Sequence, residues 1–182
     1  MFRIQLILKI IYRKFNVEGH NVAVNLDTLD KEILAILQDD GRITNAELAQ
    51  RIGLTPAPTL ARVNKLEAAG YIQRYCAMVD RKKIGLPVTA FVSVILTTHN
   101  RNASERFIKA VEEMPEVIEC HHIAGEEDFL LKVVAESPAD YETLLLNKLS
   151  SVDEVQRVKT TFVLSSPKTT TAVPIRLQEK LQ

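Results

Sequence analysis

The chain is poor in cysteine, and its two cysteines, Cys76 and Cys120, lie far apart without a Cys-x-x-Cys pair. This pattern is not the disulfide framework by which small secreted domains are stapled together. We therefore expect reduced thiols and a cytoplasmic protein. The sequence also has neither a glycine-rich phosphate loop nor a Ser/His/Asp arrangement. We therefore predict that it is not an enzyme, with no catalytic residues and no cofactor.

Long apolar runs are also missing. Lys9 interrupts the apolar stretch near the beginning of the chain, and no small-residue cleavage site follows it, so a secretory signal peptide is not predicted. A membrane-spanning helix would need roughly 20 apolar residues, while a basic amphipathic helix at a membrane surface stays an alternative. We expect residues 1–25 to be a disordered extension, or to result from a start site assigned too far upstream, and we expect no membrane partner.

The chain has no net charge, because 23 basic residues balance 23 acidic residues. Their distribution is nevertheless uneven. Between Thr55 and Lys83 there are six basic and two acidic residues, a local charge of +4, whereas the stretch from Ile84 to the end has ten basic and fourteen acidic residues, a local charge of −4. A basic segment inside an otherwise balanced chain indicates a surface that attracts anions such as nucleic acid.

Residues 26–80 have the apolar periodicity of three short helices. Asp27 or Thr28 can cap the first helix, and Thr44 forms a capping box with Glu47 at the start of the second. A tight glycine turn then leads into the third helix. This arrangement predicts a helix-turn-helix domain over residues 26–80, whose third helix would enter the major groove of DNA. The alternative is a three-helix bundle with an ordinary solvated basic face.

The third helix is expected to begin after Thr55, because Pro56 and Pro58 suit a first helical turn, where backbone N–H groups have no helical partner. We expect Leu60, Val63 and Leu66 to lie on its buried face. Hydrogen-bonding and basic side chains off that face are candidates for contacts with bases and phosphates. On the helix and the arm after it, these are Thr59, Arg62, Asn64, Lys65 and Arg74.

After a basic linker at residues 81–87, residues 88–175 alternate strand and helix in the order βαββαβ, and residues 176–182 form a tail. Ser104 and Ser137 can cap the two helices. The order is that of a ferredoxin-like fold, an antiparallel sheet with both helices on one face.

The other face of such a sheet would be left bare. Phe91, Leu131, Val133 or their neighbours would then need a cover, and a second copy of the chain is the simplest one. We therefore predict a homodimer through this domain.

Two clusters in the second half could carry chemistry. Cys120 and His122 would lie on the same face of a strand, but two ligands are too few for a zinc site, so we predict no metal. Glu126, Glu127 and Asp128 share one turn, where carboxylates could bind the ammonium group of an amino acid or serve acid–base chemistry. A polar hairpin turn is the alternative.

Over residues 26–175 the chain resembles the Lrp/AsnC (leucine-responsive/asparagine-regulator, feast–famine) family of transcription factors. The resemblance lies in the combined spacing of LDxxDxxIL, LTPxPxxxRVxxLExxGYI, PEVxxC, GxxDxLLKV and TxFVL. It implies DNA binding as dimers or octamers and the sensing of amino acids. It also implies that the recognition-helix motif includes Thr55, Pro56, Ala57, Pro58, Thr59 and Arg62, and that the effector loop spans Gly125, Glu126, Glu127 and Asp128.

Two positions depart from the family pattern. Ala57 stands where the family often has Ser or Thr, which would remove one hydroxyl contact to DNA, and Glu127 stands where Tyr or Thr is common, which leaves the effector open. We predict an α+β protein with an N-terminal winged helix-turn-helix followed by a ferredoxin-like ligand-sensing domain. Its expected function is sequence-specific regulation of transcription in response to an amino acid or a related small metabolite. The alternative is a dimeric small-molecule-binding module or enzyme with a helical head for protein contacts.

Overall fold

The structure, a computed structural model, describes residues 26–98 and 100–175, and these form two compact units. The helical unit contains the described residues up to Met78 together with those from Lys168 onward. The sheet unit extends from Val79 to Pro167. The extension predicted at residues 1–25 and the tail predicted at residues 176–182 lie outside the described residues.

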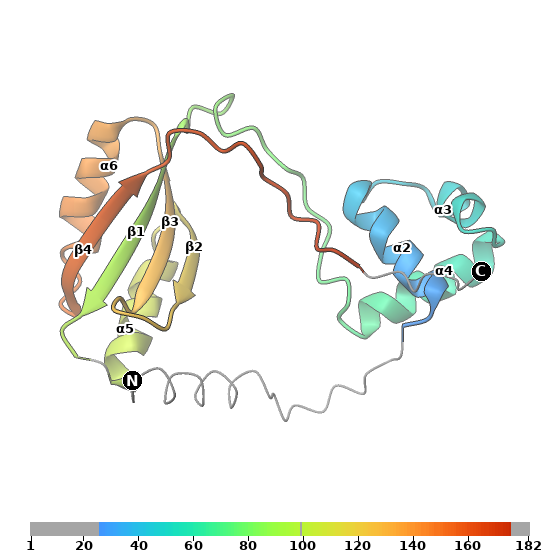
Figure 1. Cartoon of the computed structure of the whole chain (residues 1–182), viewed down its shortest axis with the longest axis horizontal. Coiled ribbons are helices and arrows are strands. Elements are labelled where there is room, and N and C mark those ends of the chain that lie inside the picture. Colours follow the sequence, from blue (N-terminus) through green and yellow to red (C-terminus); the bar gives the residue numbers. More distant parts are fainter. Residues whose placement is uncertain (1–25, 99, 176–182) are drawn as a thin grey trace. The chain divides into compact units, whose positions relative to one another are not determined.

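The helical unit consists of three short helices, α2 (Thr28–Asp39), α3 (Asn45–Arg51) and α4 (Pro56–Ala68) (Figure 1). Of the two caps that the sequence allowed for α2, the structure uses Asp27, whose carboxylate accepts a hydrogen bond from the Asp30 N–H at 2.8 Å. The three helices expected from the periodicity are therefore confirmed.

Helices of this length are stable only when neighbours pack against them. The predicted capping box at α3 is present, with Thr44 and Glu47 each accepting from the other's backbone N–H. Gly53, at φ 70°, makes the turn into α4 in the left-handed region that glycine tolerates best. The buried centre between the helices is formed by Ile33, Leu48, Ile52 and Leu66.

The buried face of α4 differs in part from the predicted one, since Leu66 is completely buried and Val63 partly buried. Leu60 is 49% exposed, whereas Thr59 is completely buried. Residues seven apart almost align along a helix, so Thr59 shares the inward side with Leu66, and Leu60 is turned away. The Thr59 hydroxyl donates to the Thr55 carbonyl oxygen at 2.9 Å, so its polar group is satisfied despite its burial.

The segment after α4 is extended and contains no strand over residues 73–80. The Tyr75 hydroxyl donates to the Glu67 carboxylate at 2.9 Å, which holds the start of this segment against α4. Residues 168–175 group with the helical unit through their contacts. There the Gln38 amide exchanges two hydrogen bonds with the backbone of Val173.

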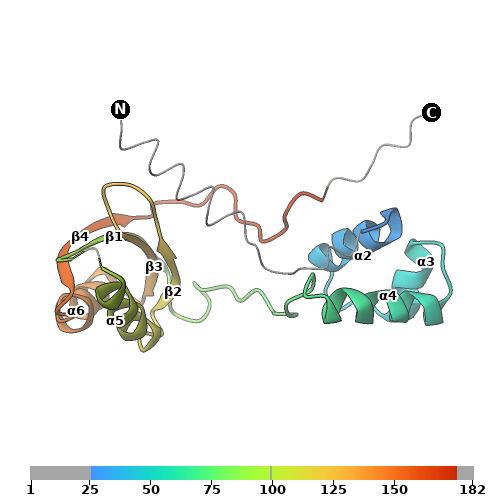
Figure 2. The same ribbon diagram turned by 90° about the horizontal axis from the view of Figure 1, so that it is seen from below.

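The sheet unit is a four-stranded sheet with two helices on one face (Figures 1 and 2). The strand order is β2-β3-β1-β4, and every neighbouring pair is antiparallel. This arrangement confirms the predicted βαββαβ fold. Its elements are β1 (Val88–Leu96), α5 (Arg101–Glu112), β2 (Val117–His122), β3 (Phe129–Ala135), α6 (Pro138–Leu144) with the π-helical turn η1 (Leu145–Leu149), and β4 (Val155–Phe162).

One of the two predicted helix caps in the sheet unit is correct. The Ser137 hydroxyl accepts from the Asp140 N–H, as predicted for α6. The prediction of Ser104 for α5 is wrong, because the helix begins one turn earlier and Asn100 caps it. Asparagine is as good a cap as serine, so the earlier start agrees with local propensity.

The alternation of β1 and β3 places one set of side chains under the helices. Leu131 and Val133 belong to this set and are almost completely buried, so the expectation that they lie on the bare face of the sheet is wrong. Phe91 does lie on the opposite side and is 36% exposed. Among the helices of the described residues, none is long and apolar enough to cross a membrane.

Candidate nucleic-acid interface

The start of α4 is fixed from two sides. Pro56 occupies the first helical position after Thr55, whose side chain makes no capping hydrogen bond. The Asn45 amide, at the first position of α3, donates to the Pro56 carbonyl oxygen at 2.8 Å. The first turn of α4 is thus tied to the helix before it, which gives the helix-turn-helix a defined angle.

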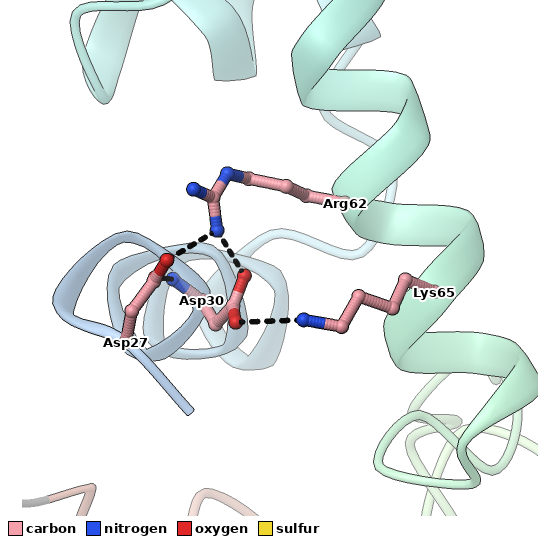
Figure 3. Close-up of polar contacts among 4 residues, drawn as sticks. All are labelled: Asp27, Asp30, Arg62 and Lys65. Carbon is pink, nitrogen blue, oxygen red and sulfur yellow. Dashed lines mark hydrogen bonds and ion pairs between the residues drawn. The ribbon is translucent and has the colours of Figure 1, made fainter. Parts of the chain in front are cut away.

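Arg62 connects α4 to the beginning of α2 (Figure 3). Its Nη1 atom donates to Asp27 Oδ2 at 2.7 Å and to Asp30 Oδ1 at 2.6 Å. Lys65, one turn later, brings its ammonium group to 3.7 Å from Asp30 Oδ2. We refer to Asp27, Asp30, Arg62 and Lys65 as the interhelix ion network.

The interhelix ion network contains a buried charge. The side chain of Asp30 is 1% exposed, while that of Arg62 is 27% exposed. The pKa of Asp27 is lowered, first by the hydrogen bond from the Asp30 N–H and then by Arg62. The pKa of Arg62 is raised by its bonds to Asp27 and Asp30. Since a buried carboxylate is costly unless it is paired, Arg62 has a structural partner already.

The predicted DNA-contact residues therefore separate into two groups. Thr59 is fully buried and Arg62 is bonded to α2, so both side chains point into the helical unit. The remaining predicted residues are exposed, namely Thr55, Pro56, Ala57, Pro58, Asn64, Lys65 and, on the segment after α4, Arg74.

Sequence reasoning also missed two exposed positions, Leu60 and Ala61. Leu60 is apolar and is expected from the pattern on the buried face, while Ala61 has no predicted role. The signal that could have found Leu60 is its spacing, because it lies three residues after Ala57 and four before Asn64 and so shares their face.

The candidate effector turn, residues 123–128, connects β2 to β3 and is anchored by Asp128. The Asp128 carboxylate accepts from the Leu96 N–H at 2.8 Å, and the Asp128 N–H donates to the Val94 carbonyl at 2.9 Å. The Ile123 N–H closes the turn on the Asp128 carbonyl at 2.9 Å. Gly125 and Glu126 are exposed and Glu127 is half-buried, so Asp128 fixes the turn while the residues before it face outward.

The described residues contain no group of three or more His, Cys, Asp or Glu side chains that could hold a metal ion. His122 instead stacks on Phe129, with ring centroids 4.8 Å apart. Burial raises the pKa of the Cys120 thiol, with a smaller contribution from Glu112. His122 therefore packs against a neighbouring strand, whereas Cys120 is a free, exposed cysteine.

Comparison with known families assigns both units. Residues 26–73 match a family described as winged helix-turn-helix DNA-binding, and residues 89–173 match the Lrp/AsnC ligand binding domain. Both descriptions agree with the architecture found here. These are families of transcription regulators and not of enzymes, which confirms the prediction that the chain is not an enzyme.

Curated relatives match over almost their whole length. The leucine-responsive regulatory protein of Rhizobium meliloti is 38% identical over 154 residues, which are 85% of this chain and 99% of the relative. The transcriptional regulator AzlB of Bacillus subtilis is 36% identical over 154 residues, covering 85% of this chain and 98% of that protein.

Solved structures give the same result. A transcriptional regulator from Neisseria meningitidis, crystallised as a complex with L-Met, is 36% identical, has a TM-score of 0.79 and covers 82% of this chain and 96% of its own. Escherichia coli AsnC is 31% identical with a TM-score of 0.74, covering 81% of this chain and 98% of its own. The fold, the family matches and these relatives together show that the chain belongs to the Lrp/AsnC family of DNA-binding transcriptional regulators.

Proposed function

We propose that the chain regulates transcription in response to an amino acid, with the exposed face of α4 against DNA and the effector at the turn of residues 123–128. The observation that carries this proposal is the separation of side chains on α4. Arg62 and Thr59 hold the helix in place from within, while the face with Ala57, Asn64 and Lys65 is exposed. This is how a recognition helix must be built if its outer face is to meet base edges.

Lys65 and Arg74 supply the phosphate contacts in this proposal. Lys65 is half-exposed and lies 3.7 Å from Asp30 Oδ2, a distance that leaves its ammonium group able to reach outward. Arg74 is exposed on the extended segment after α4. Lysine and arginine at such positions neutralise phosphates and release counterions, which makes affinity depend steeply on salt.

The test measures binding to a mixed-sequence duplex at several salt concentrations. Lys65→Ala and Arg74→Ala should each reduce the slope of log K against log salt by about 0.9. Lys109→Ala, which removes an exposed lysine from α5, is the control and should leave the slope unchanged. Unchanged slopes in both variants of the helical unit would contradict the proposed interface.

For the effector, the carboxylates of Glu126 and Glu127 would hold the ammonium group of the amino acid. Asp128 is a positioning residue, because one of its carboxylate oxygens is bonded to the Leu96 N–H. The L-Met complex of the Neisseria meningitidis relative supports an amino acid as the class of effector. The leucine-responsive relative supports the same class.

A thermal-shift screen against the individual L-amino acids tests this assignment. A ligand present at 100 times its Kd should stabilise the protein by about 2.7 kcal/mol. Glu126→Gln or Glu127→Gln should remove this shift, and Glu113→Gln at the end of α5 is the matched control. A full shift in the double Glu126→Gln/Glu127→Gln variant would place the effector elsewhere.

We also propose a homodimer formed through the sheet face opposite α5 and α6, with closure of dimers into an octamer as a further possibility to test. Phe91 is partly exposed at the centre of that face, on a strand with neighbours on both sides. Phe91→Asp should lower the sedimentation coefficient to that of a monomer, while Leu146→Asp, on the helical side, should leave it unchanged. A Phe91→Asp variant that keeps the wild-type assembly would refute this interface.

A further inference from the structure

The outward face of α4 carries a continuous apolar surface at the end that the helix-turn-helix presents to DNA. Ala57, Leu60 and Ala61 are exposed and are followed by Asn64 on the same side. Their spacing of three, four and seven residues places them in one row along the helix. We refer to Ala57, Leu60, Ala61 and Asn64 as the outward row.

The first two turns of α4 have only two polar side chains, and neither side chain faces outward. Between Pro56 and Val63 the helix has two such residues, Thr59 and Arg62. Thr59 is buried and donates to the Thr55 carbonyl. Arg62 Nη1 is held by the carboxylates of Asp27, which caps α2, and Asp30, which lies in α2. The outward row therefore offers DNA the methyl groups of its two alanines and the isobutyl group of Leu60. Asn64 is its first polar side chain.

Only one group in the major groove suits such a surface. In a helix-turn-helix, the residues near the start of the recognition helix approach the base edges. The edges of guanine, cytosine and adenine offer hydrogen-bonding groups there, whereas thymine offers its C5-methyl group as an apolar contact. Asn64, one turn later, has the amide that reads adenine through N6 and N7.

We propose that Leu60, flanked by Ala57 and Ala61, is a specificity-determining residue that reads thymine methyl groups, and that Asn64 reads an adenine beside them. The proposal rests on the placement of α4 in the major groove. An isolated exposed leucine is ordinary on a protein surface. Leu60 differs because it lies in the first two turns of the recognition helix, with Lys65 on the flank as a phosphate contact. The outward row thus predicts half-sites whose core pairs are A·T.

The experiment separates the thymine methyl group from the rest of the base. Bound duplexes are first selected from a random-sequence library with the wild-type protein. Each thymine of a selected duplex is then replaced singly by deoxyuridine, which lacks only the methyl group, and Kd is measured by fluorescence anisotropy. Burial of one methyl group is worth about fourfold in affinity, so a contacted thymine should lose about fourfold on replacement.

The variant Leu60→Ala tests whether Leu60 is the residue that contacts the thymine methyl group. Because Leu60 is half-exposed, the variant should retain the wild-type circular dichroism spectrum, and it should bind thymine and deoxyuridine duplexes within twofold of each other. Leu146→Ala, which removes an exposed leucine from the sheet unit, is the control and should keep the fourfold discrimination. Leu60→Met preserves an apolar side chain and should retain most of it.

Four outcomes would overturn the proposal. Equal losses on deoxyuridine replacement in wild type and Leu60→Ala would mean that another residue reads the methyl group. Insensitivity of every thymine in wild type would mean that the outward row does not read thymine methyl groups. Loss of all binding by Leu60→Ala would exceed one apolar contact and would assign Leu60 to folding. Failure to select any duplex would refute the placement of α4 on DNA itself, which the salt series detects separately.

Discussion

Removal of Arg62 should lower the free energy of unfolding of the helical unit while leaving that of the sheet unit unchanged. Arg62 is the hydrogen-bonded cation for Asp30, whose side chain is 1% exposed. Breaking a buried ion pair by deleting one member costs about 3–5 kcal/mol. Lys65 remains 3.7 Å from the other carboxylate oxygen, and Asp27 is half-exposed, where pairs contribute at most about 1 kcal/mol. We therefore expect Arg62→Ala to lower the free energy of unfolding of the helical unit by about 3 kcal/mol, the lower end of that range.

Hydrogen exchange with peptide resolution measures this change, because it reports the opening of each unit separately. A loss of about 3 kcal/mol should accelerate exchange in peptides of α2 and α4 by on the order of 100-fold. Peptides of β1 and β3 in the same sample should be unaffected. Arg101→Ala is the control, because Arg101 forms an exposed pair with Glu105 within α5, and it should change no peptide measurably.

A double replacement distinguishes a missing partner from a missing side chain. In Asp30→Leu/Arg62→Met both charges are absent and apolar groups of similar size remain, which is often neutral or stabilising for a buried pair. Exchange in α2 and α4 should return toward the wild-type rate. Wild-type exchange in Arg62→Ala itself would refute the structural role of Arg62 and return it to the set of DNA contacts.

Three further predictions concern the helical unit. Thr44→Ala should destabilise it by about 1 kcal/mol, because α3 loses its capping box, as judged by calorimetry. Gly53→Ala should cost about 1 kcal/mol or more, because φ 70° is strained for alanine; an unchanged melting temperature would contradict this. Burial, followed by the hydrogen bond to Glu67, raises the pKa of Tyr75 to about 12. The stabilisation of the helical unit by protonated Tyr75 should therefore be complete below about pH 10 and lost as the pH rises through about 12. Tyr75→Phe should remove the corresponding step from an absorbance titration of tyrosinate.

Most of the fold could be predicted from the sequence because its signals are local. The capping box of Thr44 and Glu47 identifies a helix start because each side chain accepts from a backbone N–H three residues away. Pro56 identifies the start of α4 because it lacks the N–H that would have no helical partner at that position. The order of strands and helices in residues 88–162 is enough to select the ferredoxin-like arrangement. Each of these inferences needs no knowledge of what a side chain touches in three dimensions.

The errors concern tertiary contacts. Thr59 was expected outside and Leu60 inside because one is polar and the other apolar, yet the hydroxyl of Thr59 is satisfied by the carbonyl four residues earlier. The ion pairs of Arg62 were not predicted either, because its two carboxylate partners precede it by 32 and 35 residues. No sequence pattern indicates a pairing over that separation, and its discovery required the packing of α4 against α2.

The contact between Gln38 and Val173 determines which amino acids can stand at position 173. The side-chain amide of Gln38 imitates a peptide group, receiving the N–H of residue 173 at 2.7 Å and donating to its carbonyl at 3.1 Å. Both hydrogen bonds use backbone atoms of residue 173, so almost any amino acid at that position could make them. Proline alone would be rejected, since it has no N–H to donate. Pro174, in contrast, helps, because it confines the preceding residue to the extended shape that the amide requires.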